Sequence, residues 1–127
     1  TLDCFHGLSR LPGVRLISLQ KGFGSEQLAG RSWVEVLQAF DEGADAFLDT
    51  AAVIANLDLV ITLDSAVAHL AGAMGRPVWV ALKRTPDWRW FLGRGDSPWY
   101  SSMRLFRQSK DGDWAGVFAE MESQVAR

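Results

Sequence analysis

Four residues in one short stretch carry groups that could bind a phosphorylated ligand. Asp64, Ser65 and Ala66 follow an apolar run, and His69 comes four residues after Ser65. The run predicts a strand over 58–63, buried on both faces, and a helix then begins at Asp64 or Ser65. The first N–H groups of a helix have no partner within it and carry partial positive charge, so a diphosphate could bind there. Residues four apart share a helix face, which directs Ser65 and His69 toward the same ligand.

Each of these residues also has a structural alternative. Asp64 could simply cap the helix, and its carboxylate would then occupy the N–H groups that a phosphate needs. His69 could be a half-buried histidine bonded to a neighbouring loop. Neither residue has the partners of a nucleophilic triad, so hydrolase chemistry is not expected. Cys4, His6 and His69 do not stand at metal-ligand spacing, and we expect neither a metal nor a cofactor.

The elements around this turn predict a βαβ unit. Helical periodicity continues over 65–75, Gly75 and Pro77 end the helix, and a second apolar run spans 78–82. Alternation of apolar runs with helical stripes is typical of an α/β fold, a Rossmann-like parallel sheet with helices on both faces. We expect strand 58–63 at its centre, flanked by the strands at 14–19 and 78–82 or by their neighbours.

The remaining elements are predicted from pattern and end signals. Alternation favours a strand at 33–37, although Val34, Leu37 and the pair Ala39 and Phe40 could instead line one face of a helix. Further predicted elements are a helix over 1–11, a helix capped by Asp49 and ending at Asn56, an edge strand at 103–106, and a last helix starting at Asp111 to Asp113 with Trp114, Val117, Phe118, Met121 and Val125 as its buried stripe.

A long excursion separates the last two strands. Residues 76–107 carry seven Lys or Arg against two Asp or Glu, a net of +5, whereas residues 1–75 carry four against nine, a net of −5. This charge indicates either a solvated face or a basic, aromatic rim for an anionic ligand. We expect one helical turn at 87–92, with Trp88, Trp90 and Trp99 packed largely against the domain, because monomers rarely expose large apolar patches.

Length and composition favour one globular domain. The chain has 127 residues, 48% of them hydrophobic, and no apolar stretch approaches the length of a membrane span. Its acidic balance argues against a nucleic-acid surface. Thr1 suggests a piece of a longer protein. The Gly22 and Gly24 pair lacks the third glycine of a dinucleotide fingerprint, which disfavours a dehydrogenase-type domain and makes a plain turn the better interpretation there.

The stretch 64–71, Asp-Ser-Ala-Val-Ala-His-Leu-Ala, followed by Gly-Arg-Pro-Val, resembles the signature of the carboxyl-terminal domain of lipopolysaccharide heptosyltransferases. It resembles still more closely the glycosyltransferase-like domains that follow tetratricopeptide repeats in bacterial proteins. The segments Ser-Leu-Gln-Lys-Gly at 18–22, Asp-Thr-Ala-Ala at 49–52, Pro-Asp-Trp-Arg-Trp at 86–90 and Ser-Pro-Trp-Tyr at 97–100 recur there in this order. The resemblance runs from about residue 12 to the end.

The resemblance implies the carboxyl-terminal half of a GT-B fold, with residues 1–127 forming one nucleotide-sugar-binding domain. Asp64 would contact the donor sugar, the N–H groups of Ser65 and Ala66 would receive the diphosphate, and His69 would lie beside the phosphate or ribose. Three further donor-binding residues are implied: Glu26 at the ribose hydroxyls, and Phe47 and Leu48 at the base. The general base would sit on an amino-terminal domain that this chain does not contain.

Two departures from the pattern matter. Heptosyltransferases have Gly after Asp-Ser, where this chain has Ala66, and the first strand of such a domain is missing before Thr1. The leading hypothesis is the donor-binding part of a cytoplasmic, inverting glycosyltransferase, inactive as an isolated fragment. The alternative is a non-catalytic module that kept the fold and uses its Trp/Arg loop to bind a partner. The expected partners are the nucleotide-diphosphate sugar, the amino-terminal domain, tetratricopeptide repeats of the same chain and, through an exposed sheet edge, a second copy.

Overall fold

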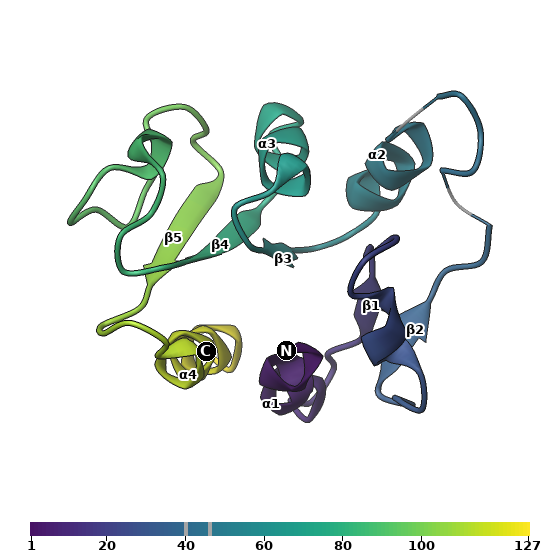
Figure 1. Cartoon of the computed structure of the whole chain (residues 1–127), viewed down its shortest axis with the longest axis horizontal. Helices are drawn as coiled ribbons and strands as arrows, with labels where there is room; N and C mark the ends of the chain where they lie inside the picture. The colour runs from purple at the N-terminus through teal and green to yellow at the C-terminus, as the bar shows by residue number, and fades with distance from the viewer. Residues whose placement is uncertain (40, 46) are drawn as a thin grey trace.

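The protein is an α/β domain with parallel strands, described here by a computed structural model in which residues 1–39, 41–45 and 47–127 are placed (Figure 1). One sheet has three strands in the order β3-β4-β5 and a second has the two strands β1-β2, and these strands pair with one another in parallel. The strands are β1 (Leu16–Ser18), β2 (Val34–Val36), β3 (Val60–Thr62), β4 (Val78–Leu82) and β5 (Met103–Arg107).

Helices lie on both sides of the strands, as the sequence predicts. In Figure 1, α3 lies above the three-stranded sheet and α2 above the two-stranded one, and α1 and α4 lie below the strands. Each side has its own buried apolar cluster, one against α3 and one around α4. The helices are α1 (His6–Ser9), α2 (Leu48–Ala55), α3 (Ala66–Ala73) and α4 (Trp114–Val125), with shorter 3-10 turns η1 (Leu2–Phe5), η2 (Ser25–Leu28) and η3 (Trp88–Trp90).

The expected pairing of 58–63 with 78–82 is confirmed, but the expected central position of 58–63 is wrong. The predicted strand at 58–63 is present as β3, but it lies at an edge, and β4 is the central strand of the three. The predicted strand at 14–19 is β1, and it pairs with β2 in the other sheet. An apolar run shows that a strand is buried but not which neighbours bury it. Val78, Val80 and Leu82 of β4 are almost fully buried, whereas Ile61 of β3 is only partly covered.

Several local predictions are confirmed. Residues 34–36 are a strand, although Phe40 of the helical alternative lies outside the described residues. Gly75 follows α3 with φ +69°, and its N–H donates to Gly72 while that of Arg76 donates to Ala71, which ends the helix as predicted. β5 is an edge strand. Asp113 caps α4, whose Val117, Phe118 and Met121 are buried.

The cap of α2 was wrongly assigned. Asp49 lies inside the first turn, and the residue before the helix, Phe47, has φ +67° and makes no capping hydrogen bond with its side chain. Asp41 caps the helix instead. One carboxylate oxygen accepts the Asp49 N–H at 2.9 Å, and the other accepts the N–H and the hydroxyl of Thr50. The Asp49 carboxylate in turn accepts the Asp41 N–H at 2.8 Å. A cap eight residues upstream leaves no periodic signal in the sequence.

These bonds make a pH-dependent contribution to stability. The hydroxyl of Thr50, followed by the two N–H groups, lowers the pKa of Asp41 below its ordinary value. The contribution is therefore complete above the ordinary pKa and is lost as pH falls through the lowered folded-state pKa. We expect Asp41→Asn to melt at a lower temperature than the parent near neutral pH, with the difference shrinking toward acid pH. Melting curves from pH 7 to pH 3 check this, and a pH-independent difference would contradict it.

The excursion between β4 and β5 is folded, but two of its three tryptophans are not packed as expected. Trp90 is fully buried, whereas Trp88 is 70% exposed and Trp99 is 55% exposed. The exposed rings are held within the excursion: Trp99 donates to the Arg89 carbonyl at 2.9 Å, and the Arg89 guanidinium lies over the Trp88 ring. Local contacts of this kind order the segment without burying it.

Candidate functional site

The turn between β3 and α3 leaves the start of the helix uncapped by any side chain. Ser65, in extended conformation, is the residue before the helix, and its hydroxyl pairs with Thr62 at 2.9 Å instead of capping. Asp64 is one residue too early to cap and is exposed. The cap interpretation of Asp64 is therefore wrong. The N–H groups at Ala66 and Val67 receive no side-chain acceptor from the described residues.

His69 is half-buried and held from two sides. Its ring stacks on Trp90 with centroids 5.3 Å apart and planes 25° apart, and its Nδ1 lies 3.0 Å from the Tyr100 hydroxyl. This is the structural alternative considered from the sequence, a histidine bonded to a neighbouring loop. It does not exclude ligand binding, because Nε2 makes no hydrogen bond to any described residue.

Tyr100 and Trp90 are the site residues that sequence reasoning missed. The Tyr100 ring lies against α3 at Gly72, where an added Cβ would stand 2.5 Å from the ring, so only glycine fits there. Ser97 holds the backbone at Tyr100 in place, since its hydroxyl accepts the Trp99 and Tyr100 N–H groups. Trp90 is buried, and its Nε1 has no acceptor among the described residues. The sequence did show that this segment is rich in aromatic residues. It did not show that two of these rings, Trp90 and Tyr100, would contact His69.

The other predicted binding residues lie on the two-stranded half of the molecule. Glu26 is exposed on η2, and Phe47 and Leu48 are exposed at the start of α2. A cavity of about 310 Å³ opens beyond the carboxyl ends of β1 and β2. None of the seven predicted binding residues lines it. Its lining is Ser18, Gln20, Lys21, Gly22, Ser25, Leu28, Val36, Leu37, Ala39 and Glu42.

A second cavity, of about 420 Å³, lies beyond the carboxyl ends of β4 and β5. Lys83 and Thr85 follow β4, Gln108 follows β5, and Trp114 begins α4. Gln108 is nearly buried, and its Oε1 accepts the Gly112 N–H. None of these polar residues stands out in the sequence, because each occupies a single position after a strand and belongs to no repeated motif.

Two of the seven basic residues of the rim expected over 76–107 form ion pairs within the segment. Arg89 pairs with Asp87 and Arg94 with Asp96, each at 2.8 Å. The hydrogen bond from Arg94 lowers the pKa of Asp96 below its ordinary value. Arg107 donates to the carbonyls of Trp90 and Arg94 and so anchors the excursion. The two acidic partners are already counted in the net charge of +5, so the segment stays basic after these pairings.

Residues 45–89 match the model of glycosyltransferase family 9 (heptosyltransferase). That segment is glycosyltransferase-like. It includes the turn at Asp64, the helix α3 with His69, and the pair Phe47 and Leu48, but not Glu26. Over 110 residues the chain is also 36% identical to protein FlbA of Caulobacter vibrioides, an alignment that covers 81% of this chain and 18% of FlbA. The chain thus spans less than a fifth of that relative. No solved structure matches.

Two features are absent from the placed part of the chain. Its residues include no group of three His, Cys, Asp or Glu side chains that could hold a metal ion. Within the same residues, no helix has both the length and the apolar character needed to cross a membrane.

Proposed function

We propose that the chain is the donor-binding part of an inverting glycosyltransferase of GT-B type, working on a nucleotide-diphosphate sugar in the cytoplasm. The observation that carries the proposal is the open amino terminus of α3, inside the segment that matches glycosyltransferase family 9. N–H groups of a helix start without a side-chain cap are free to bind the oxygens of a diphosphate. Ala66 is exposed and small, so these groups can be approached closely.

Each candidate residue receives a role from its position. Asp64, exposed beside the helix start, contacts the sugar of the donor. The N–H groups of Ser65 and Ala66 bind the diphosphate, and His69 offers Nε2 to a phosphate or ribose oxygen while Tyr100 holds Nδ1. Glu26 binds the ribose hydroxyls, with Phe47 and Leu48 bordering the base.

The reaction is a direct displacement at the anomeric carbon. A hydroxyl oxygen of the acceptor bonds to this carbon from the side opposite the diphosphate, and the bond from the carbon to the phosphate oxygen breaks. A general base on an amino-terminal domain takes the acceptor proton. The N–H groups at the start of α3 stabilise the negative charge on the departing nucleoside diphosphate, as preorganised donors do. This chain supplies only that second part.

A non-catalytic module is the second candidate, and the exposed tryptophans favour it. Trp88 and Trp99 present large apolar rings to solvent, and tryptophan is enriched at the centres of protein interfaces. Such a module would keep the fold and the ordered excursion while binding no donor. Association with tetratricopeptide repeats in a longer protein is compatible with either candidate.

Calorimetric titration with ADP, UDP and GDP tests the proposal. We expect one nucleotide to bind the parent and His69→Ala to weaken it by about ten- to a hundredfold, because a hydrogen bond to a charged group contributes about 1.5–3 kcal/mol. Tyr100→Phe keeps the imidazole of His69 but removes the hydroxyl that holds its Nδ1. The loss of nucleotide affinity in Tyr100→Phe should therefore be smaller than in His69→Ala. Asp64→Asn should leave the melting temperature unchanged, since Asp64 caps nothing, and in a catalytically complete form of the protein it should lower turnover.

The controls separate binding from folding. Melting curves of all four proteins identify any variant that loses binding because it is less folded. Failure of all three nucleotides to bind a parent protein that carries its amino-terminal domain would contradict the donor-site proposal. It would leave the non-catalytic module as the better account.

A further inference from the structure

The second cavity, of about 420 Å³, has no role in the proposed donor site. It opens beyond the carboxyl ends of β4 and β5, at the edge where open α/β sheets bind their ligands. Its volume falls within the range of about 300–1,000 Å³ that is usual for ligand pockets. None of its lining residues is among those assigned to the donor, so a ligand bound here would leave the donor residues free.

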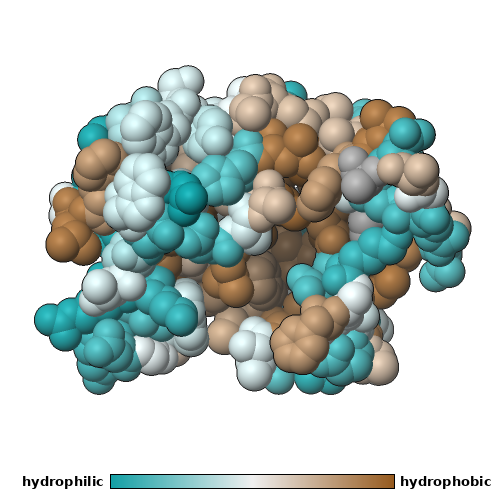
Figure 2. All heavy atoms as spheres, turned by 45° about the horizontal axis from the view of Figure 1, so that its top comes forward, coloured by the Kyte–Doolittle hydropathy of each residue, from teal (hydrophilic) through white to brown (hydrophobic). Residues whose placement is uncertain are grey.

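The lining of the second cavity is mostly polar. Figure 2 shows a hollow near the middle of one molecular face where apolar, brown side chains gather. The second cavity differs in kind, because Trp114 supplies the one large apolar ring among its described lining residues. The full lining is Lys83, Thr85, Gln108, Asp111, Gly112 and Trp114. Such a surface suits a ligand that is itself polar.

Gln108 presents a free hydrogen-bond donor to this cavity. Its backbone N–H donates to the Leu82 carbonyl at 3.0 Å, which fixes it beside the end of β4. The side chain is nearly buried, and its Oε1 accepts the Gly112 N–H at 3.2 Å, so the orientation of the amide is set. Nε2 donates to none of the placed residues, yet it is not among the fully enclosed polar atoms that lack a partner. The amide N–H bonds of Gln108 therefore open toward the cavity.

Lys83 and Asp111 place opposite charges on the same lining. Lys83 follows β4 directly, at the register position of Gln108, and Asp111 lies in the turn before α4. Neither side chain forms an ion pair or a hydrogen bond within the described ranges, so they are not paired with each other either. The neighbouring Asp113, by contrast, accepts the Ser109 hydroxyl and the Gly116 N–H. Asp113 holds this turn, which leaves the Asp111 carboxylate available to a ligand.

Trp114 adds an apolar wall to these polar groups. It is the first residue of α4, and it is half-buried against the apolar cluster that contains Phe118 and Met121. The part of the ring that remains exposed lines the cavity. An aromatic ring in this position can pack against an aliphatic group of a ligand.

We propose that the second cavity binds a small zwitterion of the α-amino acid class. The carboxylate of the ligand accepts from Nε2 of Gln108 and from the Lys83 ammonium, and the ammonium of the ligand donates to the Asp111 carboxylate. An aliphatic side chain of the ligand packs on the Trp114 ring. A ligand with a single charge would be attracted by one of the two charged side chains and repelled by the other. A sugar could hydrogen-bond to both, but only a zwitterion uses their opposite signs.

NMR titration of the 127-residue protein with L-leucine tests the proposal. We expect the side-chain amide signals of Gln108 and the indole N–H signal of Trp114 to shift, with a dissociation constant in the millimolar range. The indole signal of Trp33, which lies before β2 in the other sheet and is also half-buried, should stay in place. N-acetyl-L-leucine lacks the ammonium group and L-leucinamide lacks the carboxylate. Each should bind at least about threefold more weakly than L-leucine, a modest factor because exposed charge pairs are screened by water.

Substitutions of the two charged residues assign each contact. Lys83→Gln should remove the preference for L-leucine over L-leucinamide, and Asp111→Asn should remove the preference over N-acetyl-L-leucine. Lys110→Gln is the matched control for Lys83→Gln, since it removes the same charge from an exposed residue that does not line the cavity. All three residues are exposed, so the melting temperatures should stay close to that of the parent.

Three results would overturn the proposal. The first is equal binding of the three leucine compounds, and the second is a shift of the Trp33 signal as large as that of Trp114. The third is a shift of the Gln108 and Trp114 signals by maltose but not by L-leucine, because the cavity would then recognise hydroxyl groups. None of these results depends on nucleotide binding, since the cavity and the proposed donor site share no residue.

Discussion

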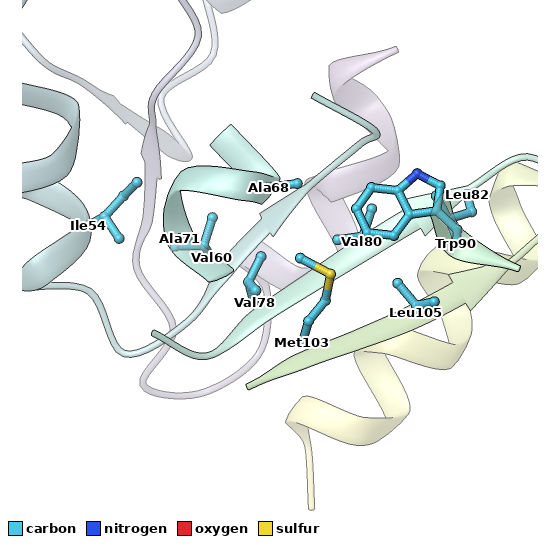
Figure 3. Close-up of a cluster of buried hydrophobic side chains, with 10 residues drawn as sticks. All are labelled: Ile54, Val60, Ala68, Ala71, Val78, Val80, Leu82, Trp90, Met103 and Leu105. Atoms are coloured by element: carbon cyan, nitrogen blue, oxygen red, sulfur yellow. The ribbon is translucent and has the colours of Figure 1, made fainter. Parts of the chain in front are cut away.

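Trp90→Ala is expected to lower the free energy of unfolding by about 3–5 kcal/mol, the usual cost of deleting a large aromatic side chain from a core. Trp90 is fully buried and belongs to the cluster that contains Val80, Leu82 and Leu105 (Figure 3). Its removal also takes away the ring on which His69 stacks. Urea unfolding of the parent and of Trp90→Ala measures this loss.

Trp88→Ala is the matched control for this effect. It removes the same side chain from the same 3-10 turn, two residues away, but Trp88 is largely exposed. Its expected change is within about 0.5 kcal/mol, as for most surface substitutions. Similar losses in the two variants would mean that the Trp88 ring is buried in solution and that the excursion packs as the sequence first suggested.

The local elements could be predicted because their signals are local. Gly75 with Pro77, and Asp113 before an apolar stripe, each fix an end of a helix within a few residues of sequence. The order of the strands could not be predicted in this way. The runs at 58–63 and 78–82 are similarly apolar, and only their neighbours decide that the second is central. Burial of a strand is a property of the whole sheet.

The candidate site was predicted in part for the same reason. The turn at Asp64 could be found, since an apolar run followed by small helix-starting residues is a local pattern. The environment of His69 depends on Tyr100, 31 residues away, and on the absence of a side chain at Gly72. Asp41 likewise caps α2 from a separate loop. Contacts between distant segments carry no periodicity, so a single sequence does not reveal them.

Ala66→Glu is expected to separate binding from stability, because its effects on the two should have opposite signs. Ala66 is the exposed first residue of α3, and no side chain caps that end. A carboxylate in the first turn interacts favourably with the helix dipole, which contributes about 0.3–1 kcal/mol to the free energy of unfolding. The melting temperature should therefore stay the same or rise. The same charge would occupy the region proposed for the diphosphate and repel it. Affinity for the nucleotide should fall at least about tenfold, or 1.4 kcal/mol.

Two further substitutions of Ala66 show whether the charge or the size of the glutamate causes the loss of nucleotide affinity. Ala66→Gln has the size of the glutamate without its charge, so a loss confined to Ala66→Glu is electrostatic. Ala66→Gly removes the methyl group and should improve the approach of a phosphate, at a cost of about 1 kcal/mol in helix stability. Calorimetric titration and thermal melting of the four proteins give both quantities. Unchanged nucleotide affinity in Ala66→Glu, in a protein that melts normally, would mean that the start of α3 does not hold the diphosphate, and the donor would then have to bind elsewhere on this domain.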